Sequence, residues 1–279
     1  MKTLGEIYQL SVQFLEQKKT VRPKFLVQEI LRYALSLDKV SLYMNFERPM
    51  ENSELEQVRT LLSVAAKGKP IEQIIGKVDF FGCEIEVTPD VLIPRQETEI
   101  LIDIVSKEVS TGPLEVWDIC TGSGCLGISF KKKFPVSKVT LSDISSKALD
   151  VAKRNAKKND VVVEFLEGDL LTPYQGKKAD LILCNPPYIS KAEFADLDAS
   201  VKDYEPALAL VGGERGTEFY EKMALTLPDY LNPGAKIYFE IGYLQGKMLS
   251  ELFSGPFWKQ KKVLKDWAGH DRFFFLEIE

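Results

Sequence analysis

The sequence predicts an α/β protein in which a small helical bundle leads through a β-hairpin linker into a doubly wound, mostly parallel sheet. In residues 1–76, apolar side chains recur at helical spacing. In residues 77–95, apolar and polar side chains alternate over a short run, as in a hairpin. In residues 96–279, short apolar runs alternate with amphipathic stretches, and repeated β–α units build parallel sheets with right-handed crossovers. We therefore expect three parts with these boundaries.

Composition limits the class of protein. The chain has 279 residues, 45% of them hydrophobic and 28% charged, which is typical of a globular protein. No apolar stretch approaches the ~20 residues that span a membrane, and the first residues lack a signal-peptide core. The four cysteines show no paired spacing, so we expect neither disulfides nor a metal site. These features predict a cytoplasmic protein that does not bind a membrane.

Charge disfavours a nucleic-acid partner. Residues 1–80 contain 12 basic and 10 acidic side chains, whereas residues 81–279 contain 24 basic and 31 acidic ones. A protein that binds a duplex usually presents a clearly basic face. We therefore expect no direct nucleic-acid contact. Separately, we expect the chain to be a monomer.

The N-terminal part reads as three or four helices. Thr3 and Glu6 have the spacing of a capping box, and Pro23 is placed to open a second helix. Ser53 and Glu56 have the same box spacing before a third apolar stripe. The stripes can bury one another in a small bundle. Its role is left open between recognition of a substrate and structural support.

After a short hairpin within residues 80–87, the rest of the chain alternates strands and helices. Helices are expected from about Leu126, after Ser145 or Ser146, within Glu214–Leu231, and over Gln245–Phe253. The expected strands are Val116–Cys120, Lys138–Asp143, Val161–Leu166, Asp180–Cys184 and Lys236–Ile241, followed by a terminal pair at Val263–Lys265 and Phe273–Ile278. Ligands of such sheets bind beyond the carboxyl ends of the strands.

Three consecutive expected strand ends carry groups suited to a nucleoside. The small residues of the loop Cys120-Thr121-Gly122-Ser123-Gly124 let backbone approach a ligand closely. Asp143 ends the next strand, where a carboxylate can accept both ribose hydroxyls. Asp169 ends the third, placed to meet an adenine amino group, with Leu170 beside the ring. A single acid at a strand end is more often a helix cap, but this ordered set favours a ligand site.

The fourth expected strand ends in Asn185-Pro186-Pro187-Tyr188. The prolines stiffen the turn and lack N–H donors, so the carbonyl groups of Asn185 and Pro186 are free to face a ligand. Tyr188 adds a flat ring that can lie against a planar group. Together they can accept both hydrogens of a planar –NH2 and hold it before an electrophile. A rigid turn without chemistry is the alternative for this segment alone.

These motifs resemble class I S-adenosylmethionine-dependent methyltransferases with a Rossmann-like sheet, and specifically the PrmC/HemK family of protein-glutamine N5-methyltransferases. The resemblance covers nearly the whole chain. Besides the two loops above, the segments that carry it are Leu92-Ile93-Pro94-Arg95, Glu97-Thr98-Glu99, Asp118, Tyr204-Glu205-Pro206, Glu240-Ile241-Gly242, Gln245 and Gly269-x-Asp271-Arg272. Cys120, Leu170 and Ala235 depart from the usual family residues.

The resemblance implies a cofactor, a substrate and residue roles. S-adenosyl-L-methionine, converted to S-adenosyl-L-homocysteine, would bind at Cys120, Thr121, Gly122, Ser123, Gly124, Asp143, Asp169, Leu170 and Asn185. Asn185, Pro186 and Tyr188 would be catalytic and, with Pro187, would bind the substrate. That substrate would be the glutamine of the Gly-Gly-Gln motif in class I peptide chain release factors.

Several other functions stay open at this stage. They are methylation of a ribosomal-protein glutamine, methylation of nucleic-acid amino groups, and nucleoside binding without catalysis. The single histidine, His270, lies far along the chain from these motifs, which argues against a Ser-His or Cys-His hydrolase.

Overall fold

The computed structural model describes residues 2–109 and 112–279. They form two compact units. One unit comprises Met1–Gly76 together with Asp198–Tyr204, and the other comprises Lys77–Leu197 together with Glu205–Glu279. None of the helices in the described ranges combines the length and apolar character required to cross a membrane.

The first unit is a bundle of short helices around its own apolar core. Thr3 and Glu6 form the predicted capping box at the start of α1, and Pro23 opens α2 as predicted. The expected cap of the third long helix is wrong. That helix begins at Asn52, and Glu51 and Glu54 form its capping box. Glu54 is also fixed by an ion pair with Arg48, which precedes the helix. The helices are α1 Leu4–Gln17, α2 Pro23–Leu35, α3 Lys39–Met44, α4 Asn52–Ala65 and α5 Ile71–Ile75, and α10 Ala199–Lys202 belongs to the same unit.

The second unit opens with the expected hairpin, in which β1 Lys77–Phe80 pairs antiparallel with β2 Cys83–Glu86. Phe81 and Gly82 both have positive φ, as a two-residue type I′ hairpin turn requires. The backbone N–H of Glu86 donates to Asn155 Oδ1 at 2.7 Å, which fixes the hairpin against a helix of the same unit.

A seven-stranded sheet forms the centre of this unit, in the order β10-β11-β9-β6-β3-β4-β5. β3, β4, β5, β6 and β9 are parallel, and β11 runs antiparallel to both β9 and β10. The doubly wound fold class is thereby confirmed. The third expected strand begins three residues late, at Glu164, because Val161 and Val163 pack on the core before pairing begins. The bounds are β3 Glu115–Ile119, β4 Lys138–Asp143, β5 Glu164–Glu167, β6 Ala179–Cys184, β9 Leu231–Glu240, β10 Trp258–Lys265 and β11 Asp271–Ile278.

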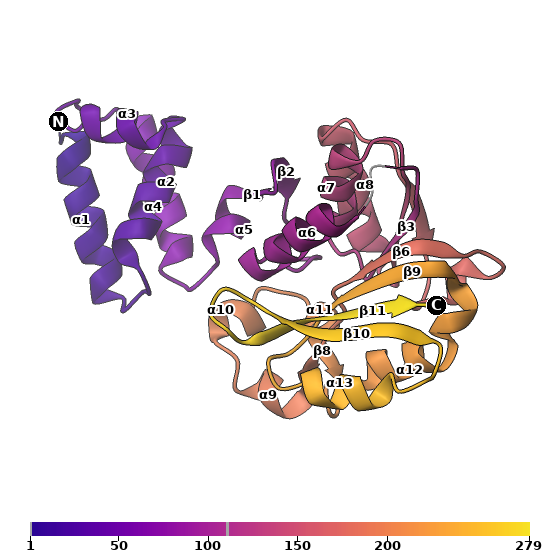
Figure 1. The fold of residues 1–279 in the computed structure, drawn as a ribbon. Coiled ribbons are helices and arrows are strands. Elements are labelled where there is room, and N and C mark those ends of the chain that lie inside the picture. The colour runs from indigo at the N-terminus through magenta and orange to yellow at the C-terminus, as the bar shows by residue number, and fades with distance from the viewer. Residues whose placement is uncertain (1, 110–111) are drawn as a thin grey trace. The chain divides into compact units, whose positions relative to one another are not determined.

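Helices cover both faces of the sheet (Figure 1). On one face lie α6 Gln96–Glu108, α7 Cys125–Lys133 and α8 Ser146–Lys158, and on the other lie α12 Glu218–Thr226 and α13 Gly246–Leu252. The sequence interpretation missed α6. Its buried Leu101 and Val105 pack into the apolar core between the sheet and the helices α6, α7 and α8. The remaining short elements are η1 Thr172–Tyr174, β7 Ile189–Ser190, α9 Lys191–Ala195, α11 Ala207–Leu210, β8 Val211–Gly213 and η2 Leu227–Tyr230.

Candidate active site

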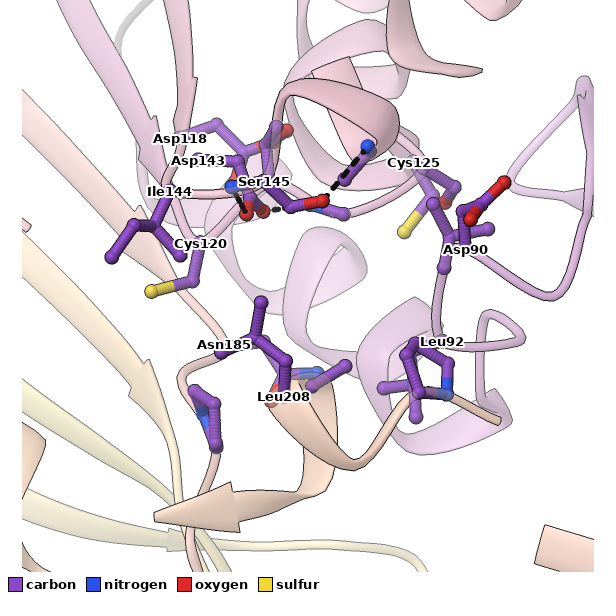
Figure 2. Close-up of a pocket in the computed structure, with 18 of the residues that line it drawn as sticks. Asp90, Leu92, Asp118, Cys120, Cys125, Asp143, Ile144, Ser145, Asn185 and Leu208 are labelled. Carbon is purple, nitrogen blue, oxygen red and sulfur yellow. Dashed lines mark hydrogen bonds between the residues drawn. The ribbon is translucent and has the colours of Figure 1, made fainter. Parts of the chain in front are cut away.

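A cavity opens within the second unit at the carboxyl ends of β3, β4 and β6 (Figure 2). This is the edge at which the sequence placed its unusual loops. Most of the predicted residues line the cavity together, but Gly124, Pro186 and Tyr188 do not. The predicted residues that line it are Cys120, Thr121, Gly122, Ser123, Asp143, Asp169, Leu170, Asn185 and Pro187.

The glycine loop turns tightly between β3 and α7. Gly124 has φ +83°, and a Cβ built there would lie 2.7 Å from Ile128 Cδ1, so only glycine fits before this helix. The side chain of Asn155, on α8, donates to the carbonyl of Ser123 at 2.9 Å. Gly124 therefore supports the loop from behind, while Gly122 and Ser123 face the cavity.

Asp118, at the end of β3, is a buried carboxylate that the sequence interpretation did not select as a site residue. Its Oδ2 accepts hydrogen bonds from Thr121 Oγ1 at 2.5 Å and from the backbone N–H of Gly127 at 2.8 Å. Its Oδ1 is buried without a hydrogen-bond partner, and Asp118 is one of the residues that line the cavity. Burial raises the pKa of this carboxyl to about 7, against the opposing effect of those two hydrogen bonds. A cationic ligand group would satisfy the unpartnered oxygen.

Asp143 follows on β4, and both of its oxygens are oriented by backbone. Oδ2 accepts from Gly122 N–H and Oδ1 accepts from Ser145 N–H, each at 2.9 Å (Figure 2). Each carboxylate oxygen keeps a further lone pair for a hydroxyl donor. Burial raises the pKa of Asp143 as well. The neighbouring Ile144 is an apolar residue of the cavity wall that the sequence interpretation also missed.

Asp169 and Leu170 continue the wall after β5. Asp169 forms an ion pair with Lys222 at 3.4 Å, and the buried Leu170 has φ +50°. Acidic and apolar groups thus alternate around the cavity. This combination of carboxylates and apolar side chains suits a nucleoside that also carries a positive charge.

The loop after β6 is held rigidly by its surroundings. Asn185 Nδ2 donates to Thr98 Oγ1 at 3.3 Å. The side chain of Gln245 donates to the carbonyl of Tyr188 at 3.0 Å, and its own carbonyl accepts from Gly242 N–H. Asn185 lines the cavity, and Pro186 and Pro187 are buried.

Tyr188 is not among the residues that line the cavity, and its contact with a planar group stays a prediction. Its hydroxyl donates to Glu240 Oε1 at 3.3 Å, and burial raises the pKa of the phenol above its usual range. The ring packs against the apolar core under the sheet. Tyr188 thus supports the loop from below in this arrangement.

A further buried acid, Glu205, holds together two other segments that line the cavity. Glu205 Oε2 accepts from Ile93 N–H at 2.9 Å, while Oε1 pairs with the guanidinium of Arg95. This contact joins the segment after the hairpin to the segment before α11, and both segments line the cavity. The sequence signal for Glu205, Thr98, Glu240 and Gln245 was their presence in the motifs quoted above.

Sequence comparisons find two matching families and several similar proteins. The family described as "Methyltransferase small domain" matches residues 96–201, and the family described as "PrmC N-terminal domain" matches residues 6–76. A release factor glutamine methyltransferase from Bacillus subtilis is 36% identical over 280 residues, covering 98% of this chain and 96% of the relative. One from Geobacter sulfurreducens is 35% identical, covering 90% of this chain and 88% of the relative.

Solved structures support the fold. A methyltransferase from Pyrococcus furiosus has a TM-score of 0.55 and 21% identity, covering 80% of this chain and 98% of that one. A 16S rRNA methyltransferase from Thermus thermophilus, in complex with AdoMet and guanosine, has a TM-score of 0.52 and 14% identity, covering 73% of this chain and 50% of that one. At these identities the likeness concerns the fold alone.

Proposed function

Because this chain belongs to the family of release factor glutamine methyltransferases, we propose that it methylates the N5 amide nitrogen of a glutamine. The substrate is the glutamine of the Gly-Gly-Gln motif in class I peptide chain release factors. Relatives that share more than a third of their residues over nine-tenths of the chain support this assignment. The single structural observation that carries it is Asn185, anchored by its amide nitrogen on the wall of an acidic cavity.

The methyl donor is S-adenosyl-L-methionine, which supplies an electrophilic methyl group on a sulfonium. The cavity fits its charge and shape. The unpartnered Oδ1 of Asp118 suits the ammonium group, Asp143 suits the ribose hydroxyls, and Ile144 and Leu170 suit the flat adenine ring. We propose that Cys120–Gly124, Asp143, Asp169, Leu170 and Asn185 form this site, with Gly124 acting from behind the loop.

The residues of the loop after β6 act on the substrate amide. An amide nitrogen is a poor nucleophile because its lone pair is delocalised into the carbonyl. Asn185 Oδ1 and the carbonyl of Pro186 accept the two N–H hydrogens and stabilise positive charge that develops on nitrogen. No side chain is required as a base, because the methylated nitrogen loses its proton readily. Pro187 and Tyr188 keep the loop in place.

The two units have different roles in this proposal. Residues 96–279 carry the chemistry, residues 77–95 link the two parts, and the bundle of residues 1–76 recognises the intact protein substrate. The enzyme works as a monomer in the cytoplasm, without a nucleic-acid partner. A ribosomal-protein glutamine and a nucleic-acid amino group are the alternative substrates.

Replacing Asn185 with Ala tests this proposal. The change removes the side-chain acceptor, and loss of one preorganised group typically lowers kcat about 10²–10³-fold. Turnover on a release factor is measured by mass spectrometry of the Gly-Gly-Gln peptide, and cofactor binding by calorimetry. Cofactor affinity should change far less than turnover, since Asp118 and Asp143 are untouched.

Asn232→Ala is the matched control. Asn232 donates to Asp180 at the opposite end of β6, so its loss should leave turnover unchanged. Wild-type turnover by Asn185→Ala would refute the role of Asn185. Methylation of a ribosomal protein or RNA, but of no release factor, would instead assign the alternative substrate.

A further inference from the structure

A buried polar chain lies directly behind Asn185. Asn185 Nδ2 donates to Thr98 Oγ1 at 3.3 Å, and Thr98 Oγ1 donates to Glu240 Oε2 at 2.7 Å. Thr98 is only 2% exposed and Glu240 only 1% exposed. The three residues come from the loop after β6, the first turn of α6 and the end of β9.

The direction of these hydrogen bonds follows from counting hydrogens. An ionised carboxylate has none, so Glu240 must receive the single hydroxyl hydrogen of Thr98. The oxygen of Thr98 then has only lone pairs to offer, and it can face only the –NH2 side of the Asn185 amide. Asn185 Oδ1 is consequently turned away from Thr98. An ionised Glu240 therefore selects one of the two amide orientations.

We propose that Thr98 and Glu240 are positioning residues that keep the carbonyl oxygen of Asn185 directed at the substrate amide. The inference rests on the proposed function. The negative charge of Glu240 also polarises the Thr98 hydroxyl and, through it, the Asn185 amide. This polarisation increases the electron density on Asn185 Oδ1. That oxygen is the group that stabilises positive charge on the reacting nitrogen.

Protonation of Glu240 would reverse this arrangement. A protonated carboxyl can donate to Thr98, whose hydroxyl is then free to donate to Asn185 Oδ1 and to favour the flipped amide. Burial raises the pKa of Glu240 to about 7, against hydrogen bonds from Thr98 and Tyr188 and the charge of Arg272. The charged or titratable side chains around Glu240 are Glu97 on α6, Cys125 on α7, Tyr188 after β6, Tyr220 on α12 and Arg272 on β11. Activity should therefore fall as pH drops through about 7.

The first test compares three threonine variants by kcat at saturating cofactor. Thr98→Val keeps the shape but removes the hydroxyl, so we expect kcat to fall roughly 10–100-fold through misplacement of the Asn185 amide. Thr98→Ser restores the hydroxyl and should recover most of the activity. Thr140→Val is the matched control, because Thr140 is a buried β4 residue whose hydroxyl makes only a 3.5 Å contact with Glu164.

The second test uses Glu240→Gln and the pH profile. Saturating cofactor is needed because Asp118 also has a pKa of about 7 in the cofactor cavity. Wild-type kcat should rise with pH and level off above about 7, and Glu240→Gln should abolish this dependence. The side-chain NH2 resonance of Asn185, assigned by its loss in Asn185→Ala, should shift with the same midpoint only in the wild type.

These outcomes separate the inference from the proposed function. If the wild type methylates a release factor but Thr98→Val matches it, the positioning role is wrong while the function stands. If Thr98→Ser is as slow as Thr98→Val, Thr98 acts by packing and the inference also fails. If the wild type methylates no glutamine, the proposed function fails, whereas the pH-dependent Asn185 resonance still reports on the polar chain.

Discussion

At the scale of single residues, the buried acids link the site to stability. Asp118 has a folded-state pKa of about 7, raised from 3.8 mainly by burial. Between these values the folded chain holds a proton that the unfolded chain has lost. This contribution to stability is fully present below the lower value and is lost as pH rises through about 7. Without a ligand, the folded protein is therefore less stable above about pH 7, where Asp118 is ionised and can bind a cationic group.

Asp118→Asn should weaken this pH dependence. The amide oxygen can still accept from Thr121 and Gly127, while the charge disappears. Between pH 5 and pH 7.5 the melting temperature of the variant should fall less than that of the wild type. The fall that remains comes from other buried acids with raised pKa values, such as Glu240 and Asp143. Calorimetric unfolding at the two pH values measures this. Equal losses in both proteins would show that Asp118 does not titrate in this range.

Residues near the ligand loops could be found from sequence, and those that support them could not. Asp143, Asp169 and Asn185 end apolar runs, so their place at one edge follows from strand order. Thr98 and Glu240 lie 142 positions apart, and their contact exists only after α6 has packed beside β9. Tyr188 sits in the right loop but points its hydroxyl to Glu240, a direction that depends on that same packing.

At the scale of elements, periodicity predicted the strands and most helices but not their exact ends. β5 was placed three residues early because its preceding valines are apolar core residues without strand partners. α6 was missed because its first turn, Gln96–Glu99, is polar. This turn was read only as part of the family motif Glu97-Thr98-Glu99. The short pair β7 and β8 was also missed. It places Gly212 against the loop that carries Asn185.

Gly212→Ala should therefore damage turnover. A Cβ at this position would lie 2.4 Å from the carbonyl oxygen of Pro187, so the loop must shift. A displacement of about 1 Å can cost on the order of 10²-fold in rate. We expect a lower kcat on a release factor with nearly unchanged cofactor affinity by calorimetry. Gly112→Ala is the control, because no atom of the described residues, apart from its chain neighbours, lies within 4 Å of its Cβ position. Wild-type kcat in Gly212→Ala would mean that the loop tolerates this shift.

At the scale of the whole molecule, each unit buries its own apolar core, so the exposed apolar residues of the bundle are not needed to fold it. Two such residues, Val40 and Met44, lie one turn apart on α3 and are 67% and 80% exposed. Composition alone could identify this part as a bundle but could not tell which side chains remain outside its core. If the bundle recognises the intact substrate as proposed, these two exposed side chains are available to contact it.

Replacing Val40 and Met44 with Ser tests whether the bundle recognises the intact substrate. Loss of about 1 kcal/mol of contact energy would raise KM for an intact release factor roughly fivefold. KM for a short Gly-Gly-Gln peptide should stay unchanged, because such a peptide reaches only the loop of Asn185. Leu225→Ser, at an equally exposed α12 position of the second unit, should alter neither value. If KM for the intact protein is unaffected, these α3 residues do not bind it. If both KM values rise together, the substitutions act through the active site, and the bundle has no separate role in choosing the protein.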